Sequence, residues 1–278
     1  MGDFIRPEPV AAGVVRLSLL SRVALLGEPT NTYIMATLLG GIVVDPASHS
    51  PEAIEAVEGI LQEVGGLAGI LVTHGHADHW EGVVPLWERY GGWVAVHPRL
   101  VGRIPDIPEA AYRPLREGDL LAGWTVLETP GHTRDHIVLW RKSDGVMLVG
   151  DVVAGIGTTV ISPPEGDMAA YLETLHRLKA LRPRALLPGH GPPISDAVTA
   201  LEALIQHRLE REQAVLAALD EVPRSVRELV PRVYTDVPEE RWGLAEHSLL
   251  AHLIKLEAEG RALRHPLGWT ASRLSRPN

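Results

Sequence analysis

Residues 73–79 read Thr-His-Gly-His-Ala-Asp-His, and this segment follows directly on an apolar run that ends at Thr73. A short apolar run bounded by polar residues predicts a buried strand, so the histidines come at the end of a strand and in the loop beyond it. In a loop, ligands two residues apart can converge on one ion, and the adjacent Asp78 and His79 can turn toward a second. The segment therefore predicts a metal site at a strand end.

Three further segments place histidine or aspartate directly after a predicted strand, and in each of them glycine or proline turns the chain. The segments are Pro130–Thr133, Gly150–Asp151 and Pro188–Gly191. Four strand ends that present such side chains are consistent with one shared edge. That edge would gather the seven candidate ligands His74, His76, Asp78, His79, His132, Asp151 and His190.

The types of donor limit the kind of metal site. The chain has no cysteine, which excludes disulfides, cysteine nucleophiles, iron–sulfur clusters and cysteine-based zinc fingers. Seven donors are too many for one tetrahedral zinc ion, and they suit two ions that share a bridging carboxylate and a bridging water. Imidazole with a few carboxylates favours two Zn²⁺ ions, with Mn²⁺ or Fe²⁺ as alternatives.

Up to about residue 195, short apolar runs alternate with helical segments, which predicts sheets covered by helices. The predicted helices are Pro51–Val64, with Ser50 as its N-cap, and Met168–Leu181. The predicted strands are Val14–Leu17, Thr32–Leu38, Gly41–Val44, Ile70–Thr73, Trp93–His97, Trp124–Glu128, Ile137–Trp140 and Val146–Val149.

From about residue 197 the pattern is helical, and Gly260 ends the last helix. Three helices followed by a hairpin are the layout of a winged helix-turn-helix. The predicted helices are Ala197–Leu219, Pro223–Val230 and Leu244–Glu259, and the predicted hairpin strands are Arg261–Arg264 and Trp269–Ser272. We expect two domains, residues 1–200 and 201–278.

The net charge of −9 lies wholly in residues 1–202, because residues 203–278 hold as many acidic as basic side chains. An acidic body disfavours non-specific binding of nucleic acid. The run Leu17–Leu26 is interrupted by Arg22, and no stretch reaches about 18 uninterrupted apolar residues, so we expect a cytoplasmic, soluble protein with no membrane partner.

The C-terminal module has two interpretations. One is contact with nucleic acid through its last arginines, and the other is a dimerisation or lid module, which allows for a homodimer. The segment 244–259 carries Lys255 as its one basic residue, so sequence-specific DNA binding is not expected. The arginines concerned are Arg261, Arg264, Arg273 and Arg276.

The four motifs together (HGHADH, PGHT, an aspartate after a strand, and PGHG) resemble the metallo-β-lactamase superfamily. The order of Asn31-Thr32-Tyr33, these motifs, and a tail with His207-Arg208, Glu212-Gln213, Tyr234 and His252 is similar to the beta-lactamase-like protein two subgroup. The resemblance implies a four-layer αββα sandwich, of class α/β (α+β), followed by a small winged helix-turn-helix. It also implies that His74, His76 and His132 hold a first metal, that Asp78, His79 and His190 hold a second, and that Asp151 bridges them.

The resemblance implies a metal-dependent hydrolase. As a hypothesis for its mechanism, we expect a metal-bridging hydroxide to attack the substrate, with Asp78 orienting the hydroxide and relaying a proton. Some members of the subgroup are single-strand endoribonucleases, so the first hypothesis is an RNA phosphodiesterase. The second is a thioester, ester or lactone hydrolase of the glyoxalase II kind, and the third is a metal-dependent regulator. Trp80 and Glu81 stand where the family usually has small residues, so the mouth of the site is expected to differ.

Four further residues are candidates for supporting roles. His136 either orients a ligand or only packs. Asn31 either shapes the floor of the site or serves a turn. Thr158 and Thr159 either contact the substrate or are ordinary loop residues. The other histidines match no ligand pattern and are expected to be surface or core residues; they are His49, His97, His176, His207, His247, His252 and His265.

Overall fold

The computed structural model describes residues 5–23 and 27–272. The chain divides into two compact units. The first comprises Met1–Thr129, Asp135–Gly157 and Arg182–Ala197, and the second comprises Pro130–Arg134, Thr158–Leu181 and Val198–Asn278. Arg273 and Arg276, which the sequence analysis considered for contact with nucleic acid, lie outside the described residues.

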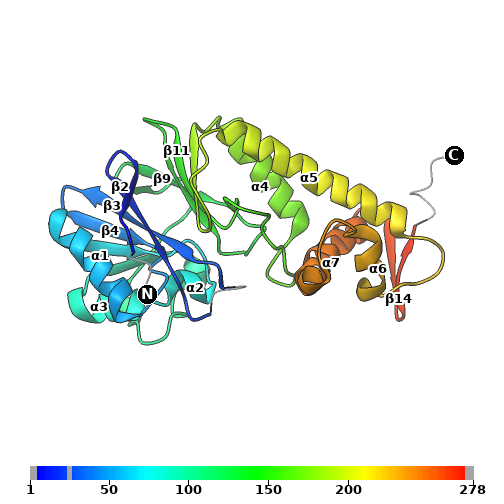
Figure 1. Cartoon of the computed structure of the whole chain (residues 1–278), viewed down its shortest axis with the longest axis horizontal. Helices are drawn as coiled ribbons and strands as arrows, with labels where there is room; N and C mark the ends of the chain where they lie inside the picture. The colour runs from blue at the N-terminus through cyan, green and yellow to red at the C-terminus, as the bar shows by residue number, and fades with distance from the viewer. Residues whose placement is uncertain (1–4, 24–26, 273–278) are drawn as a thin grey trace. The chain divides into compact units, whose positions relative to one another are not determined.

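The first unit is built on a seven-stranded sheet with the order β1-β2-β3-β4-β5-β6-β7. Figure 1 labels β2, β3 and β4 of this sheet. The strands from β1 to β4 pair antiparallel, and those from β4 to β7 pair parallel. The strands are β1 (Glu8–Ala11), β2 (Val14–Leu19), β3 (Thr30–Thr37), β4 (Gly40–Val44), β5 (Leu67–Leu71), β6 (Trp93–Val96) and β7 (Tyr112–Pro114). The helices of this region are α1 (Pro51–Glu63), α2 (Ala77–Trp80) and α3 (Val83–Tyr90), with 3-10 turns at Pro98–Leu100 and Glu109–Ala111.

A second sheet of the same unit has five strands in the order β12-β11-β10-β9-β8. Its strands pair antiparallel except β11 and β12, which are parallel. The strands are β8 (Leu120–Leu121), β9 (Trp124–Glu128), β10 (Ile137–Arg141), β11 (Val146–Gly150) and β12 (Ala185–Pro188).

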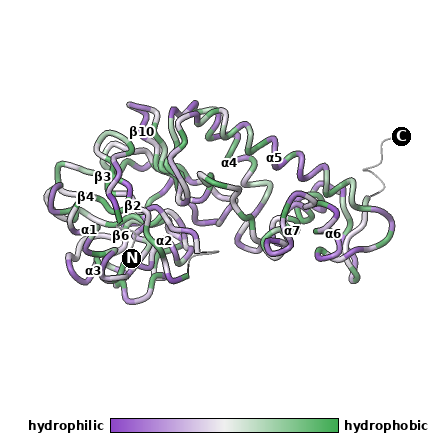
Figure 2. Tube along the Cα trace, viewed as in Figure 1, coloured by the Kyte–Doolittle hydropathy of each residue, from purple (hydrophilic) through white to green (hydrophobic). Residues whose placement is uncertain are grey.

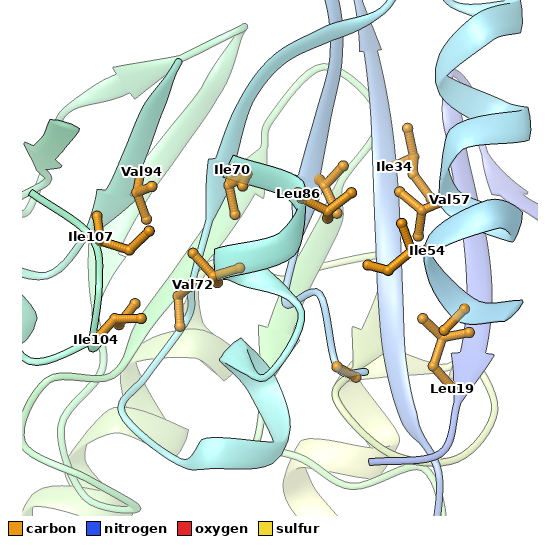
Figure 3. Packing of buried hydrophobic residues seen from close by; sticks show 14 of the residues in the cluster. Leu19, Ile34, Ile54, Val57, Ile70, Val72, Leu86, Val94, Ile104 and Ile107 are labelled. Atoms are coloured by element: carbon orange, nitrogen blue, oxygen red, sulfur yellow. The ribbon is translucent and has the colours of Figure 1, made fainter. Parts of the chain in front are cut away.

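Two apolar clusters hold the layers of this unit together. On one face of the seven-stranded sheet, Ile54 and Val57 of α1 and Leu86 of α3 pack against strand residues such as Ile34 and Ile70 (Figure 3). The other face of that sheet meets the five-stranded sheet in a second cluster, which includes Met35, Ile42, Trp124 and Leu139. Helices, sheet and sheet therefore follow one another as layers, and successive residues of β3 and β4, such as Ile34 and Met35, alternate between the two clusters.

The second unit is mostly helical. Its helices are α4 (Met168–Ala180), α5 (Ala197–Ala218), α6 (Val226–Val233) and α7 (Trp242–Ala258), with a 3-10 turn at Glu239–Arg241, and its hairpin is β13 (Ala262–His265) and β14 (Gly268–Ala271). Hydrophobic and hydrophilic residues alternate along α5 (Figure 2). A core that includes Val215, Leu229, Leu249 and Trp269 joins α5, α6, α7 and the hairpin, which is the predicted winged-helix layout.

The predicted strands and helices are all present, with ends that shift by a few residues. Ser50 caps α1 by accepting a hydrogen bond from the backbone N–H of Ala53, and Gly260 takes a left-handed φ of +70° after α7. The prediction that Asp78 and His79 lie in a loop is wrong, because the chain forms the short helix α2 there, followed by α3. Among the described residues, no helix is long and apolar enough to cross a membrane.

Candidate metal centre

Strand ends of both sheets bring candidate ligands together. His74 follows β5, Asp151 follows β11 and His190 follows β12. The turns after β11 and β12 are joined by a hydrogen bond of 2.7 Å from the backbone N–H of Gly189 to the carbonyl of Gly150. Asp78 and His79 lie in the short helix α2, which begins at Ala77 after the non-helical residues Gly75 and His76.

The candidate ligands form two groups, and within each the ligand atoms lie within 4.8 Å of one another. The first group is His74, His76, His132 and Asp151, and the second is Asp78, His79 and His190. The structure therefore brings together all seven residues named from the sequence, in the division that the resemblance implies. Their binding of metal stays a prediction.

The carboxylate of Asp151 lies between the two groups. Its Oδ2 is 3.9 Å from Nε2 of His74 and 3.4 Å from Nε2 of His190, and its Oδ1 is 3.4 Å from Nε2 of His79. Burial acts to raise the pKa of Asp151, but the neighbouring His79 and His190 lower that pKa well below its usual range. The side chain is thus an anion placed to serve both groups.

Hydrogen bonds fix the direction of several imidazole rings. His190 has Nδ1 3.0 Å from the carbonyl oxygen of Pro29, and His132 has Nδ1 2.9 Å from that of Val160. A carbonyl oxygen accepts only, so in both rings Nδ1 carries the proton and Nε2 is left as the possible ligand atom. Support of this kind is usual for histidines that bind metal.

His79 provides a test of whether a metal fits. Its ring is fully buried, and Nδ1 donates to the carboxylate Oδ2 of Asp45 across 2.9 Å. Its buried Nε2 has no hydrogen-bond partner among the described residues, although it faces Oδ1 of Asp151 at 3.4 Å and Oδ2 of Asp78 at 3.9 Å. A lone pair directed at two carboxylates needs a proton or a cation between them, so the donor set fits a metal ion.

Asp45 was not identified from the sequence, although it holds this part of the site. Its Oδ1 accepts from the backbone N–H of Thr73 and its Oδ2 from the hydroxyl of Thr73, both at 2.7 Å. The same hydroxyl lies 3.0 Å from Nδ1 of His74. Asp45 follows β4 directly, and this position at a strand end is the one signal in the sequence that could have pointed to it.

His136 and Asn31 are both buried supports rather than ligands. Nε2 of His136 accepts from the backbone N–H of Asp151 at 3.1 Å, and its Nδ1 lies 2.8 Å from the hydroxyl of Thr129. The side-chain amide of Asn31 donates to the carbonyls of Pro188 and Gly191, at 2.9 and 2.7 Å. Each therefore holds the backbone beside a candidate ligand.

The remaining candidates belong to neither ligand group. Thr158 is exposed, and Thr159 is buried with its carbonyl accepting a hydrogen bond from Arg208; both belong to the second unit. Trp80 donates from Nε1 to the carbonyl of Gly75 at 3.1 Å. Glu81 accepts from the hydroxyl of Ser21 at 2.6 Å and from the backbone N–H of Arg22 at 2.9 Å, so it fastens the start of the loop after β2.

Comparisons with known protein families identify both parts of the chain. Residues 25–190 match the metallo-beta-lactamase superfamily, and residues 225–269 match the beta-lactamase associated winged helix domain. A beta-lactamase-like protein 2 homolog of Drosophila melanogaster is 31% identical over 271 residues, which are 91% of this chain and 90% of the relative. An atrochrysone carboxyl ACP thioesterase of Emericella nidulans is 28% identical over 207 residues, which are 72% of this chain and 64% of the relative.

Solved structures give the same result. A metallo-beta-lactamase family protein from Thermus thermophilus superposes with a TM-score of 0.78 at 26% identity, over 94% of this chain and 99% of that one. A protein solved in a di-iron-bound form superposes with a TM-score of 0.54 at 30% identity, over 64% of this chain and 96% of that one. The expected fold class, with its C-terminal winged helix, is confirmed.

Proposed function

Because this chain belongs to the metallo-β-lactamase superfamily of hydrolases, we propose that it uses two metal ions to hydrolyse a thioester or ester. The observation that carries the proposal is the position of Asp151. Its carboxylate reaches toward His74 of one ligand group and toward His79 and His190 of the other, as a bridging ligand must. A carboxylate in this position would hold a metal ion together with either group, and metal ions bound there would supply the chemistry for attack by water on a carbonyl group.

The metal we propose is zinc, at two ions per chain, because five imidazoles and two carboxylates make up the donor set. The relative solved with two irons supports a binuclear site and keeps Fe²⁺, like Mn²⁺, as an alternative. When bound, such ions polarise an oxygen of the substrate and lower the pKa of a bound water toward about 7.

The protein's own contribution centres on Asp78. Its Oδ2 accepts from the hydroxyl of Thr30 at 3.2 Å and lies 3.5 Å from Nε2 of His190. We propose that this carboxylate orients the attacking water and takes up a proton at Oδ2 for transfer to the leaving group. His136 and Asn31 keep the backbone beside Asp151 and His190 in place, so the site needs little rearrangement to act.

Two observations favour a thioester or ester over RNA. A relative of 28% identity is an acyl carrier protein thioesterase. In the second unit, several basic side chains are already paired with acids of the same unit, namely Arg211 with Asp236, Arg224 with Asp220, and Lys255 and Arg261 with Glu212 and Glu259. A basic side chain that is already paired with an acid contributes little to the binding of a phosphate backbone.

We also propose the domain boundary of the sequence analysis, with a hydrolase domain at 1–200 and a winged-helix module at 201–278. The matched ranges 25–190 and 225–269 support it, since each falls inside one proposed domain. In this proposal the module serves packing or dimerisation rather than sequence-specific binding of DNA.

The test is a side-by-side assay of metal-loaded protein on a panel of acyl thioesters and on single-stranded RNA. Asp151→Ala removes the proposed bridging ligand, and Asp144→Ala, which breaks an ion pair with Arg141 and lies in neither ligand group, is the matched control. We expect thioester turnover that is lost in Asp151→Ala and kept in Asp144→Ala. If RNA alone is cleaved, and the cleavage is lost in Asp151→Ala, the endoribonuclease hypothesis replaces ours.

A further inference from the structure

The imidazole of His132 is held by a neighbouring segment of its own unit. His132 is buried, and its Nδ1 donates to the carbonyl oxygen of Val160 across 2.9 Å. That carbonyl therefore sets both the direction of the ring and which nitrogen is left for a metal. The position of the segment around Val160 thus determines where the metal-binding nitrogen lies.

Helix α4 fixes the backbone on which His132 stands. The hydroxyl of Thr174 donates to the carbonyl of Pro130, and the backbone N–H of Asp167 donates to the carbonyl of Gly131, both at 2.8 Å. Gly131 has a φ of +139°, and a Cβ at this position would come within 2.3 Å of the Cα of Tyr171. The turn before His132 is thus pressed directly against Tyr171.

Helices α5 and α7 fix the segment that orients the ring. The guanidinium of Arg208, from α5, donates to the carbonyl of Thr159. The hydroxyl of Ser248, from α7, accepts from the backbone N–H of Ile161 at 3.3 Å. Both neighbours of Val160 are therefore held by side chains from C-terminal helices.

Arg208 contacts both the segment that orients the ring of His132 and the helix α4 that fixes its backbone. Its side chain is 2% exposed, and its guanidinium lies over the ring of Tyr171, 5.3 Å from the centroid. We propose that Arg208 is a positioning residue for His132, which links the winged-helix module to the metal site through Thr159 and Tyr171. This inference rests on the proposed function in one respect, which is that His132 binds a metal.

The experiment measures metal binding rather than catalysis. Purified full-length chain is stripped of metal and titrated with Zn²⁺ against a chromophoric chelator, and the Co²⁺ form is examined by its visible absorption spectrum. Arg208→Met should weaken the site that contains His132 by about 10-fold or more, because losses of support around a metal ligand reach about 10–100-fold. The other site should keep its affinity, and Arg208→Lys, which keeps one donor for Thr159, should recover part of the loss.

Arg211→Met is the matched control, because Arg211 lies on the same helix and binds the carbonyl of Val233 and the carboxylate of Asp236 instead. Ser248→Ala tests the same segment from α7 with a smaller change and decides the question if Arg208→Met does not fold. Wild-type affinity and spectrum in folded Arg208→Met and Ser248→Ala would overturn the proposal, as would an equal loss in Arg211→Met. Wild-type protein that binds two ions but hydrolyses no substrate overturns the proposed function and leaves the positioning role standing.

Discussion

The carboxylate of Asp45 accepts a hydrogen bond from Nδ1 of His79 across 2.9 Å, with both side chains closed off from solvent. The same carboxylate accepts from the hydroxyl of Thr73, which in turn lies 3.0 Å from Nδ1 of His74. One side chain that is not itself in either ligand group thereby orients one histidine of each. Partners of this kind fix the tautomer and increase the basicity of a metal ligand.

Asp45→Asn should weaken metal binding while leaving the fold in place. Asp45 has a φ of +50°, and asparagine accepts this left-handed conformation at least as readily as aspartate does. The amide carries no charge, so His79 and Thr73 lose their anionic acceptor, and we expect metal affinity to fall about 10–100-fold. Chelator competition measures the loss.

Asp144→Asn is the control for that change, because Asp144 is a surface acid paired with Arg141. It should bind metal as the wild type does. Equal affinities in Asp45→Asn and the wild type would show that the hydrogen bond to His79 is not needed to hold the ring.

Gly189→Ala should disturb the metal site by steric crowding alone. Gly189 lies between two candidate ligands, and a Cβ there would be 2.3 Å from Oδ1 of Asp151 and 2.7 Å from Cε1 of His79. Neither buried side chain can withdraw without leaving the site, so we expect the variant to fold and to bind fewer than two ions per chain. Metal analysis of the dialysed protein gives the number.

Gly59→Ala is the comparison, since Gly59 lies in α1 with nothing within 4 Å of the added Cβ. It should keep both ions and gain up to about 1 kcal/mol of stability from the better helix former. Two ions bound to Gly189→Ala would mean that the turn after β12 moves aside at little cost.

The grouping of the candidate ligands could be predicted from the sequence because they follow recognisable strands and turns. His74, Asp151 and His190 each come after an apolar run, and parallel neighbours such as β11 and β12 present their ends at one edge. The C-terminal module could be predicted as well, because its helices are long enough to show a period and Gly260 ends the last one.

Other features of the fold and of the site leave no recognisable pattern in the local sequence. Strands β7 and β8 have three and two residues, and the helix α2 has four, so no periodicity can reveal them. Asp45 stands alone after its strand, without a histidine or a glycine turn to mark it. The support of His132 by Arg208 joins residues far apart in the chain, and only the fold shows it.

Glu81→Gln should change substrate binding more than metal binding. Glu81 accepts hydrogen bonds from Ser21 and Arg22, at the start of a loop whose other end, Thr30, donates to Asp78. A neutral amide holds that loop less firmly, so we expect KM to rise several-fold while both ions remain bound. Steady-state kinetics with metal analysis separates the two effects.

Glu88→Gln is the control, because Glu88 is a residue of α3 that makes none of these contacts. It should leave KM unchanged. A loss of metal from Glu81→Gln, or an unchanged KM, would contradict a role for Glu81 in holding the loop.

His252 in α7 is a buried base of the second unit. It is fully buried, and neither ring nitrogen has a hydrogen-bond partner among the described residues, with Oε2 of Glu212 lying 4.0 Å from its Nδ1. Burial first, and then the positive charges of Arg208 and Lys255, lower its pKa from 6.5 to about 3. The folded protein thus keeps this ring neutral in mild acid.

This depressed pKa makes His252 a source of acid sensitivity. In the unfolded chain this ring becomes protonated as the pH falls below about 6.5, whereas in the folded chain it stays neutral down to about pH 3. The unfolded state therefore binds more protons in this range, so acid favours unfolding. Between those values the free energy of unfolding should fall by about 1.4 kcal/mol per pH unit from this group alone. In His252→Gln that contribution disappears. Urea titrations of the metal-free protein at pH 4, 5, 6 and 7 should therefore show that its free energy of unfolding depends less steeply on pH than that of the wild type.

His176→Gln is the control, because His176 lies on the exposed face of α4, and this variant should follow the wild-type curve. Parallel curves for His252→Gln and the wild type would show that the ring is already protonated in the folded protein.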